Sequence, residues 1–252
     1  MGRQLALLYG VLCYLIFFAT FLYAIAFVGG VFVPLSLDSD PAGPFAESLL
    51  IDAILLGIFA VQHSVMARPA FKRWWTRFVP AAVERSTYVL FSSLALILLF
   101  WQWRPLGGMV WQVDSLVARD VLWALFALGW ATVLIGTFLI NHFDLFGLRQ
   151  VWLNWRRTPY TPPGFVTPLF YRVVRHPIML GFIVAFWATP HMTLAHLIFA
   201  IATTAYILIA LQLEERDLVR YHGEAYKQYQ QQVPMIVPIP KSKPAPEPSA
   251  PQ

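Results

Sequence analysis

Two groups of polar side chains bound one apolar segment of this chain, and together they have the chemistry of a charged-ligand site. Arg175, His176 and Pro177 precede the segment, and Glu214 and Glu215 follow it. Pro177 predicts the start of a helix, and a helix N-terminus offers free N–H groups to a carboxylate or phosphate. Two carboxylates at a helix end oppose its dipole. Unless that end is solvated, a nearby arginine or a cationic ligand must compensate them.

Two further polar groups lie far from these in the sequence. His63 follows Gln62 near the end of one apolar run, and Asn141, His142 and Asp144 follow another. Each group has a structural alternative, which is interfacial hydrogen bonding for His63 and a helix cap for the Asn141 group. Ionisable groups near membrane depth are costly, so function is the default hypothesis if the chain brings these groups together.

The elements that must position these residues are membrane-spanning helices. The chain of 252 residues is 58% hydrophobic and 12% charged, against roughly 25% charged in soluble domains. Four apolar runs can cross about 30 Å of hydrocarbon, at residues 5–33, 48–66, 88–103 and 117–140, of which the third is short and could extend toward Val83. A fifth, at 178–213, is too long for one crossing, and Pro190 should break it into a helical hairpin, either two crossings or a re-entrant unit. The fold class predicted is therefore an all-α polytopic bundle of five to six transmembrane helices with short cytoplasmic helices.

Shorter features refine this outline. Segments 68–79 and 149–172 mix basic and aromatic side chains, which is typical of interfacial segments. Prolines in the second segment prevent it from being one helix, and it could serve as a lid. Gly223 predicts the end of the last long helix, and residues 224–232 predict a short helix after it.

The basic residues predict the orientation of the spans. Sixteen of the 18 lysines and arginines fall on one side if the N-terminus is cytoplasmic and the hairpin returns to its starting face. Basic residues favour cytoplasmic loops, so we expect a multi-pass membrane protein with its polar groups at the cytoplasmic face; a bacterial inner membrane is implied only by the family resemblance given below. The net charge of +5 then indicates anchoring at the bilayer rather than nucleic-acid binding.

Metal and disulfide chemistry find little support in the sequence. The lone Cys13 excludes an internal disulfide and a cysteine-cluster metal site. His63, His142 and His176 lack a paired metal-ligand spacing, so no metal is expected.

The chain also carries a series of motifs that resembles a known family. The C-terminal series is Arg175-His176-Pro177-Ile178-Met179-Leu180-Gly181, Glu214-Glu215-Arg216-Asp217-Leu218, Gly223-x-x-Tyr226-x-x-Tyr229 and Val233-Pro234. It resembles the signature of isoprenylcysteine carboxyl methyltransferase-like integral membrane enzymes, with Met179 where that family usually has an aromatic residue. Two N-terminal motifs are similar to those of the methanethiol S-methyltransferase subgroup, which makes dimethyl sulfide: Gln62-His63-Ser64-Val65-Met66-Ala67-Arg68 and Asn141-His142-Phe143-Asp144-Leu145-Phe146-Gly147-Leu148.

The resemblance implies S-adenosylmethionine as methyl donor, bound by the hairpin and the helix after it. Carried over by position, the cofactor-binding residues would be Arg175, His176, Pro177, Gly181, Glu214, Glu215 and Tyr226. Adjacent helical residues diverge by about 100°, so only one of the two glutamates is expected to face the cofactor. Gly181 lacks a Cβ, which allows either a ligand or a neighbouring helix to approach closely.

The implied reaction moves a methyl group from a sulfonium to a small volatile thiol. A small alkyl thiol is weakly acidic, so a base should help at neutral pH. We predict that His142, oriented by Asp144, is this catalytic base, with His63 as the alternative. Methanethiol is the expected acceptor, with hydrogen sulfide as a second candidate, and the bilayer is the expected route of entry. No protein partner is evident.

We predict three parts of the chain. Residues 1–148 form a four-span bundle on the acceptor side, 149–237 bind the cofactor, and 238–252 are a disordered tail. Two other functions remain open. One is methylation of another thiol, a carboxylate or a lipid by an enzyme of the same superfamily. The other is a transporter or redox-associated subunit, although transporter sites normally lie at the midplane between repeats and no repeat is evident.

Overall fold

The computed structural model describes residues 2–41 and 43–239, and these are almost entirely helical. The elements are α1 (Arg3–Gly29), α2 (Phe45–Ala67), α3 (Pro69–Trp75), α4 (Ala81–Gln102), β1 (Met109–Gln112), α5 (Leu116–Ile140), α6 (His142–Leu145), α7 (Leu148–Trp155), the 3-10 turn η1 (Leu169–Arg172), α8 (Pro177–Trp187), β2 (His191–Thr193), α9 (Leu194–His222) and α10 (Glu224–Gln232). The predicted all-α fold is confirmed, and two short antiparallel strands are added to it. The predicted tail from residue 240 onward lies outside the described residues.

Five helices are long and apolar enough to cross a membrane, namely α1, α2, α4, α5 and α9. Four of them match the predicted spans, except that α4 begins at Ala81, seven residues before the predicted 88–103 run. The first turns of α4 carry Glu84 and Ser86. A search for apolar runs leaves out such polar residues, yet both are buried in the fold. A multi-pass membrane protein is therefore confirmed.

The predicted hairpin is strongly asymmetric. Helix α8 has 11 residues, which is roughly 16 Å and too short to cross about 30 Å of hydrocarbon. Helix α9 has 29 residues and is long enough to cross. The break at Pro190 is confirmed, because α8 ends at Trp187 and the chain then passes through strand β2, which pairs with β1. Of the two alternatives, the short arm excludes two full helical crossings.

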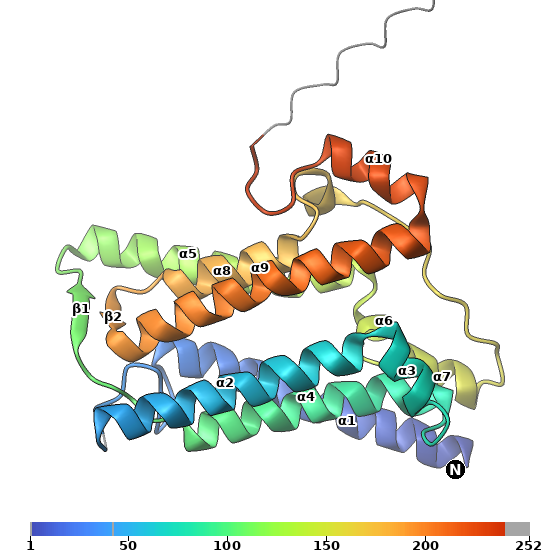
Figure 1. Ribbon diagram of the computed structural model, residues 1–252, viewed down its shortest axis with the longest axis horizontal. Coiled ribbons are helices and arrows are strands. Elements are labelled where there is room, and N and C mark those ends of the chain that lie inside the picture. The colour runs from blue at the N-terminus through green and yellow to red at the C-terminus, as the bar shows by residue number, and fades with distance from the viewer. Residues whose placement is uncertain (1, 42, 240–252) are drawn as a thin grey trace, which may run out of the picture.

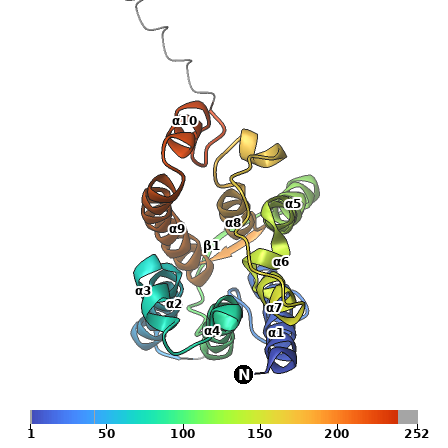
Figure 2. The same cartoon turned by 90° about the vertical axis from the view of Figure 1, so that its right-hand side faces the viewer.

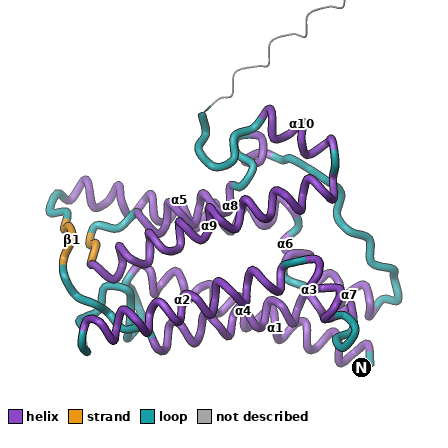
Figure 3. Tube along the Cα trace, viewed as in Figure 1, coloured by secondary structure: helices purple, strands orange, loops and turns teal. Residues whose placement is uncertain are grey.

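The long helices lie in two layers (Figure 1). Helices α1, α2 and α4 form one layer, and α5, α8 and α9 form the other, with α10 outside it. In Figure 2, which looks along the bundle, the long helices are arranged around its central axis. The tube in Figure 3 shows that the strands lie at one end of the bundle, opposite the ends at which α2, α5 and α9 stop. We call the end opposite the strands the polar end.

Packing explains why the two ends of the bundle differ. Near the strands, a hydrophobic cluster joins the layers and includes Phe27, Leu99, Trp103, Phe126 and Phe199, all at most 7% exposed. Such burial is the main stabilising term in folding. At the polar end, hydrogen-bonded and charged side chains replace it. The strand end thus has an apolar core with a hydrogen-bonded group of Asp38, Thr193 and His196 beside it, and charged side chains gather at the polar end.

Helix α8 packs closely along α5 because glycines face each other. A Cβ at Gly181 would lie 2.7 Å from the Gly129 carbonyl oxygen, and a Cβ at Gly129 would lie 2.7 Å from the Gly181 carbonyl oxygen. Small residues that let helix backbones approach are typical of helix pairs in membranes. Of the two alternatives for Gly181, the structure supports the neighbouring helix.

The predicted short features are also present. Helix α9 ends at His222, and Gly223 has a positive φ of 61°. Helix α10 spans the predicted residues 224–232. Segment 149–172 is not one helix: α7 ends at Trp155, and an irregular stretch connects it to η1.

Candidate functional site

The Glu215 carboxylate is the centre of a buried polar cluster at the polar end. Its Oε1 accepts from Arg175 Nε at 2.6 Å, from His176 Nε2 at 3.1 Å and from the Tyr226 hydroxyl at 3.4 Å. Its Oε2 accepts from Gln230 Nε2 at 2.8 Å. The sequence-based expectation that residues before α8 and at the end of α9 meet is confirmed. Gln230 was missed, because a polar residue on a polar helix carries no distinguishing pattern.

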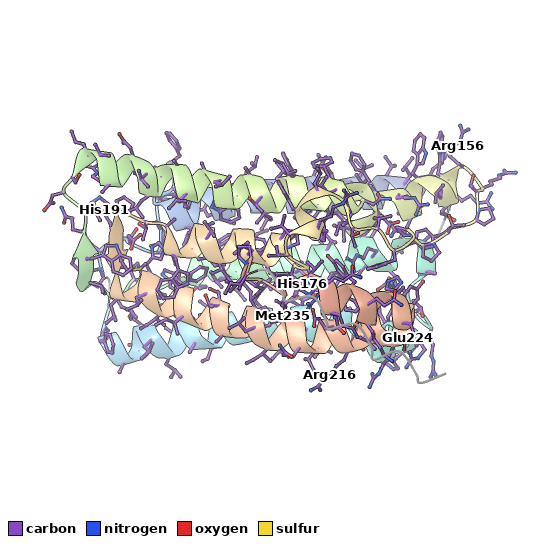
Figure 4. The ribbon with its side chains drawn as sticks, turned by 90° about the horizontal axis from the view of Figure 1, so that it is seen from above. Arg156, His176, His191, Arg216, Glu224 and Met235 are labelled. Carbon is purple, nitrogen blue, oxygen red and sulfur yellow. The ribbon has the colours of Figure 1, made fainter. Side chains whose placement is uncertain are left out.

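The chain after α10 folds back to complete this cluster. The backbone N–H groups of Arg175 and His176 donate to the carbonyls of Pro234 and Met235, at 2.9 and 3.1 Å. In the view from above in Figure 4, His176 lies beside Met235 about halfway along the bundle, and Arg216 points outward from it. Arg175 Nη1 also donates to the carbonyls of Gln230 and Val233. The irregular backbone before α8 is therefore hydrogen-bonded, as it must be at membrane depth.

Glu214 differs from Glu215 in having no such partners. Within residues 2–41 and 43–239, its carboxylate forms no hydrogen bond or ion pair. Its charge acts on the Tyr88 hydroxyl of α4 and the Tyr206 hydroxyl of α9. Burial, with the negative charge of Glu214 adding to it, raises the pKa of Tyr171 and Tyr226. In the described part of the chain, the Glu214 carboxylate is thus without a hydrogen-bond partner and is open to a cationic or hydroxyl-bearing one.

His63 lies deep in the bundle between α2 and α4. Its Nδ1 is 3.2 Å from the Ser92 hydroxyl, and that hydroxyl donates to the Tyr88 carbonyl at 3.1 Å. A hydroxyl has one proton, so in the tautomer with the proton on Nδ1, Ser92 accepts from Nδ1–H and the Nε2 lone pair remains. The Tyr88 hydroxyl lies 3.0 Å from Nε2 and 3.1 Å from Nδ1, so it is within hydrogen-bond distance of both nitrogens. Tyr88 therefore joins the imidazole of α2 to the neighbourhood of Glu214.

His142 lies in a separate, largely aromatic environment. Thr137 donates its proton to the Leu134 carbonyl, so it accepts from His142 Nδ1 at 2.8 Å. The Tyr14 hydroxyl lies 2.9 Å from Nε2, and the Phe138 ring stacks on the imidazole at a centroid distance of 4.1 Å. Burial lowers the pKa of His142. The ring is thus held neutral, with both nitrogens engaged by hydroxyl groups.

Asp144 does not orient His142, contrary to the prediction. Its carboxylate binds Arg149 Nη1 at 2.9 Å and the Tyr160 hydroxyl at 3.1 Å. The two residues are two positions apart in α6, and helical residues at that spacing do not face each other. Thr137 and Tyr14 hold the imidazole instead. Neither was singled out from the sequence, since a lone tyrosine or threonine in an apolar span gives no signal.

The remaining predicted residues have clear structural places. Pro177 is buried at the first position of α8, as its sequence predicted. A cavity of about 330 Å³ lies next to the cluster between α9 and α10, lined by Gln212, Glu215, Arg216, Val219, Arg220 and Gln230. In the described part of the chain, no three His, Cys, Asp or Glu side chains are grouped to hold a metal ion. The site can bind a polar ligand through carboxylates, tyrosines and guanidinium groups.

Comparisons with known proteins identify the family. The family described as NnrU protein matches residues 50–237. Methanethiol S-methyltransferase of Mycobacterium tuberculosis is 59% identical over 240 residues, which cover 95% of this chain and 98% of that protein. Methanethiol S-methyltransferase of Crocosphaera subtropica is 58% identical over 239 residues, covering 95% and 94%. Nurim of Mus musculus is 29% identical over 185 residues, covering 68% of each.

No solved structure matches the chain. The family match covers most of the chain, and the more similar relatives align from end to end. The protein therefore belongs to the NnrU family, in the group of relatives named methanethiol S-methyltransferase.

Proposed function

We propose that the protein methylates methanethiol to dimethyl sulfide, with S-adenosylmethionine as methyl donor. Relatives that carry this activity in their name share 52–59% of their residues with the chain over 84–95% of its length. The observation that carries the proposal is the Glu215 cluster, in which Arg175, His176, Tyr226 and Gln230 meet at the end of α9, next to the unpartnered carboxylate of Glu214 in the sequence. The reaction must bring a cationic donor and a thiol to one place, and this location suits both.

The residues at the polar end fit the donor. When bound, S-adenosylmethionine supplies a methyl group on a sulfonium. Glu214 would hold its amino group or ribose hydroxyls, because its carboxylate still has acceptor capacity. Glu215 would act indirectly, since Arg175, His176, Tyr226 and Gln230 already occupy it. This division favours Glu214 over Glu215 as the glutamate that holds the donor.

The acceptor side is assigned to His63, ahead of His142. Both rings keep the Nε2 lone pair that a base needs. His63 shares Tyr88 with the surroundings of Glu214, whereas the hydrogen-bond partners of His142 are Tyr14 and Thr137. The thiol proton would pass to His63 Nε2, directly or through the Tyr88 hydroxyl. The thiolate sulfur then attacks the methyl carbon as the carbon–sulfonium bond breaks.

Positioning accounts for most of the catalysis in this proposal. The opposite charges of thiolate and sulfonium neutralise in the transition state, so a site that excludes water favours the reaction. Alignment of the two sulfurs across the methyl group contributes several kcal/mol through proximity. The apolar core at the strand end and the hydrogen-bonded segment 233–237 support such exclusion of water.

The distribution of basic residues supports a cytoplasmic location for the polar end. Of the 16 lysines and arginines in the described residues, all but Arg104 and Arg119 lie on that side, and basic loops favour the cytoplasm. A donor dissolved in the cytoplasm would then reach the Glu215 cluster directly, and the volatile thiol would enter from the bilayer.

Membranes that contain the full-length protein test the proposal. They are incubated with S-adenosylmethionine and methanethiol, and dimethyl sulfide is measured in the headspace. We expect dimethyl sulfide to form with the unaltered protein and not with the Glu214→Gln variant. Tight S-adenosylmethionine binding without product from methanethiol or hydrogen sulfide would refute the acceptor and leave methylation of another thiol, a carboxylate or a lipid. Failure to bind S-adenosylmethionine would refute the donor.

A further inference from the structure

A second cavity lies apart from the proposed active site, at the outer surface of the polar end. Its volume is about 390 Å³, and it is bounded by α3, the first turns of α4, α7 and the start of the loop after α7. Six of its lining side chains are polar or charged and matter here: Lys72, Glu84, Arg85, Gln150, Asn154 and Tyr160. The Glu215 cluster uses none of them, although the Arg85 guanidinium lies over the Tyr88 ring, 5.0 Å from its centroid.

The cavity carries a small positive charge. Lys72 and Arg85 are cationic, and Glu84 is anionic, so the three side chains sum to +1. Glu84, whose side chain is 7% exposed, binds Lys72 Nζ at 3.1 Å, but a lysine ammonium has three protons and can serve a second acceptor. Arg85 Nε donates to the Leu145 carbonyl at 2.7 Å, and within the described residues its Nη groups form no hydrogen bond. Two cationic donors are therefore available to an anion.

One neutral acceptor in the cavity also lacks a partner. The Gln150 side-chain nitrogen donates to the Asp144 carbonyl at 3.0 Å, which fixes the orientation of its amide. Its Oε1 has almost no exposed surface and no hydrogen-bond partner, so a ligand reaches it only when the Gln150 side chain turns toward the cavity. An unsatisfied buried acceptor is costly, so a ligand with a hydroxyl or other donor next to its anionic group would be favoured.

The surroundings of the cavity have the composition of a membrane interface. Helix α3 and the turn after it expose Trp74 and Phe78, and α7 exposes Trp152 and Trp155. Tryptophan and other amphipathic rings gather at the level of the lipid headgroups. Four arginines near these rings form no ion pair in the part of the chain that the structure describes: Arg73, Arg77, Arg156 and Arg157. The opening of the cavity thus lies among groups that attract an anionic bilayer surface.

We propose that this cavity binds the headgroup of an anionic phospholipid with a free hydroxyl, such as phosphatidylglycerol. The phosphodiester accepts hydrogen bonds from Lys72 and Arg85, and a headgroup hydroxyl donates to Gln150 Oε1. A phosphodiester carries one negative charge, which matches the net charge of +1. Free phosphate is about half dianion at neutral pH, and the Glu84 carboxylate disfavours that form. The inference is independent of the methyl-transfer proposal.

Lipid binding to the full-length protein in detergent tests this inference. Native mass spectrometry compares phosphatidylglycerol with phosphatidylcholine, and we expect at least tenfold tighter binding of the former. Lys72→Gln should weaken it about fivefold, which corresponds to about 1 kcal/mol for one basic residue at an anionic surface. Ala82→Leu, which fills the cavity and leaves every charge in place, should weaken it more than tenfold. The matched control is Arg73→Gln, on the same helix but outside the cavity, with less than a twofold effect.

Several results would overturn the assignment. Equal losses in Lys72→Gln and Arg73→Gln would mean diffuse surface attraction instead of a site. Full binding by Ala82→Leu would place the lipid elsewhere. Displacement of the lipid by an equal concentration of inorganic phosphate would make this a free-phosphate site. Thermal unfolding checks the fold of each variant, and Asn154→Leu fills the cavity from α7 if Ala82→Leu is unstable.

Discussion

Replacing Glu215 with glutamine removes the negative charge that holds Arg175. The two side chains are 12% and 6% exposed and lie 2.6 Å apart. Removing one partner of a buried ion pair costs about 3–5 kcal/mol, because the other charge remains buried. Arg175 keeps two backbone carbonyls as acceptors, so we expect the lower end, about 3 kcal/mol. A loss of 1 kcal/mol lowers Tm by roughly 2–4 °C in a chain of this size, which gives roughly 6–12 °C for Glu215→Gln.

Glu214→Gln is the matched control because it makes the same chemical change one position away. Its carboxylate has no hydrogen-bond partner in the described part of the chain, so its Tm should move by about 2 °C or less. S-adenosylmethionine affinity should instead fall roughly 10- to 100-fold, the range of a hydrogen bond to a charged group. Tryptophan fluorescence on heating gives Tm in detergent, and calorimetric titration gives the affinity.

The two glutamates thus have opposite expected signatures. If Glu214→Gln lowered Tm as much as Glu215→Gln, the Glu214 carboxylate would be a structural group, and its assignment to the donor would be lost. An unchanged Tm in Glu215→Gln would contradict the reasoning that the ion pair holds the segment after α10 in place.

Three other predictions concern the base, the helix contact and pH. His63→Ala should lower kcat about 100-fold or more while S-adenosylmethionine affinity is kept, and a larger loss in His142→Ala than in His63→Ala would reverse our ranking. Gly181→Ala should cost about 1–3 kcal/mol by overpacking against α5, whereas Gly57→Ala, with nothing within 4 Å of its added Cβ, should be tolerated; equal Tm values for both variants would exclude a tight α5–α8 contact. The pKa of His142 is lowered by burial, so the unfolded chain takes up this proton more readily, near its usual value of about 6.5. The stability contribution is therefore present above pH 6.5 and is lost as pH falls below it; Tm measured from pH 8 to 5 should fall less steeply in His142→Gln, and identical slopes would contradict the shift.

The spanning helices, their breaks and their ends could be predicted, because hydropathy and charge are properties of a whole segment of chain. The five spanning helices, the break at Pro190 and the helix boundary at Gly223 follow from apolar length and from backbone preferences that the residues carry themselves. The convergence of Arg175 and Glu215 followed from counting crossings. No detail of side-chain packing was needed for any of these.

Features that depend on contacts between distant residues could not be predicted. The length of α8 is set where β2 pairs with β1, and a hydropathy profile contains no such pairing. Asp144 is near His142 in sequence, but the direction of each side chain on α6 separates them. Tyr88 and Gln230 belong to the site through hydrogen bonds across the fold, and neither stands in a motif that marks it as functional.

The pairing of residues 175–176 with residues 234–235 determines the order in which the protein can mature. During synthesis, Arg175 emerges long before Gln230 and Val233, whose carbonyls it contacts across 55 and 58 residues of chain. Helix α8 must therefore enter the membrane with its flanking arginine still lacking those acceptors. The segment before α8 is completed only when nearly the whole chain has left the ribosome. A chain that terminates at Gln232 would insert its spans and remain without a finished site, so the last residues of the fold control whether the membrane contains an active protein.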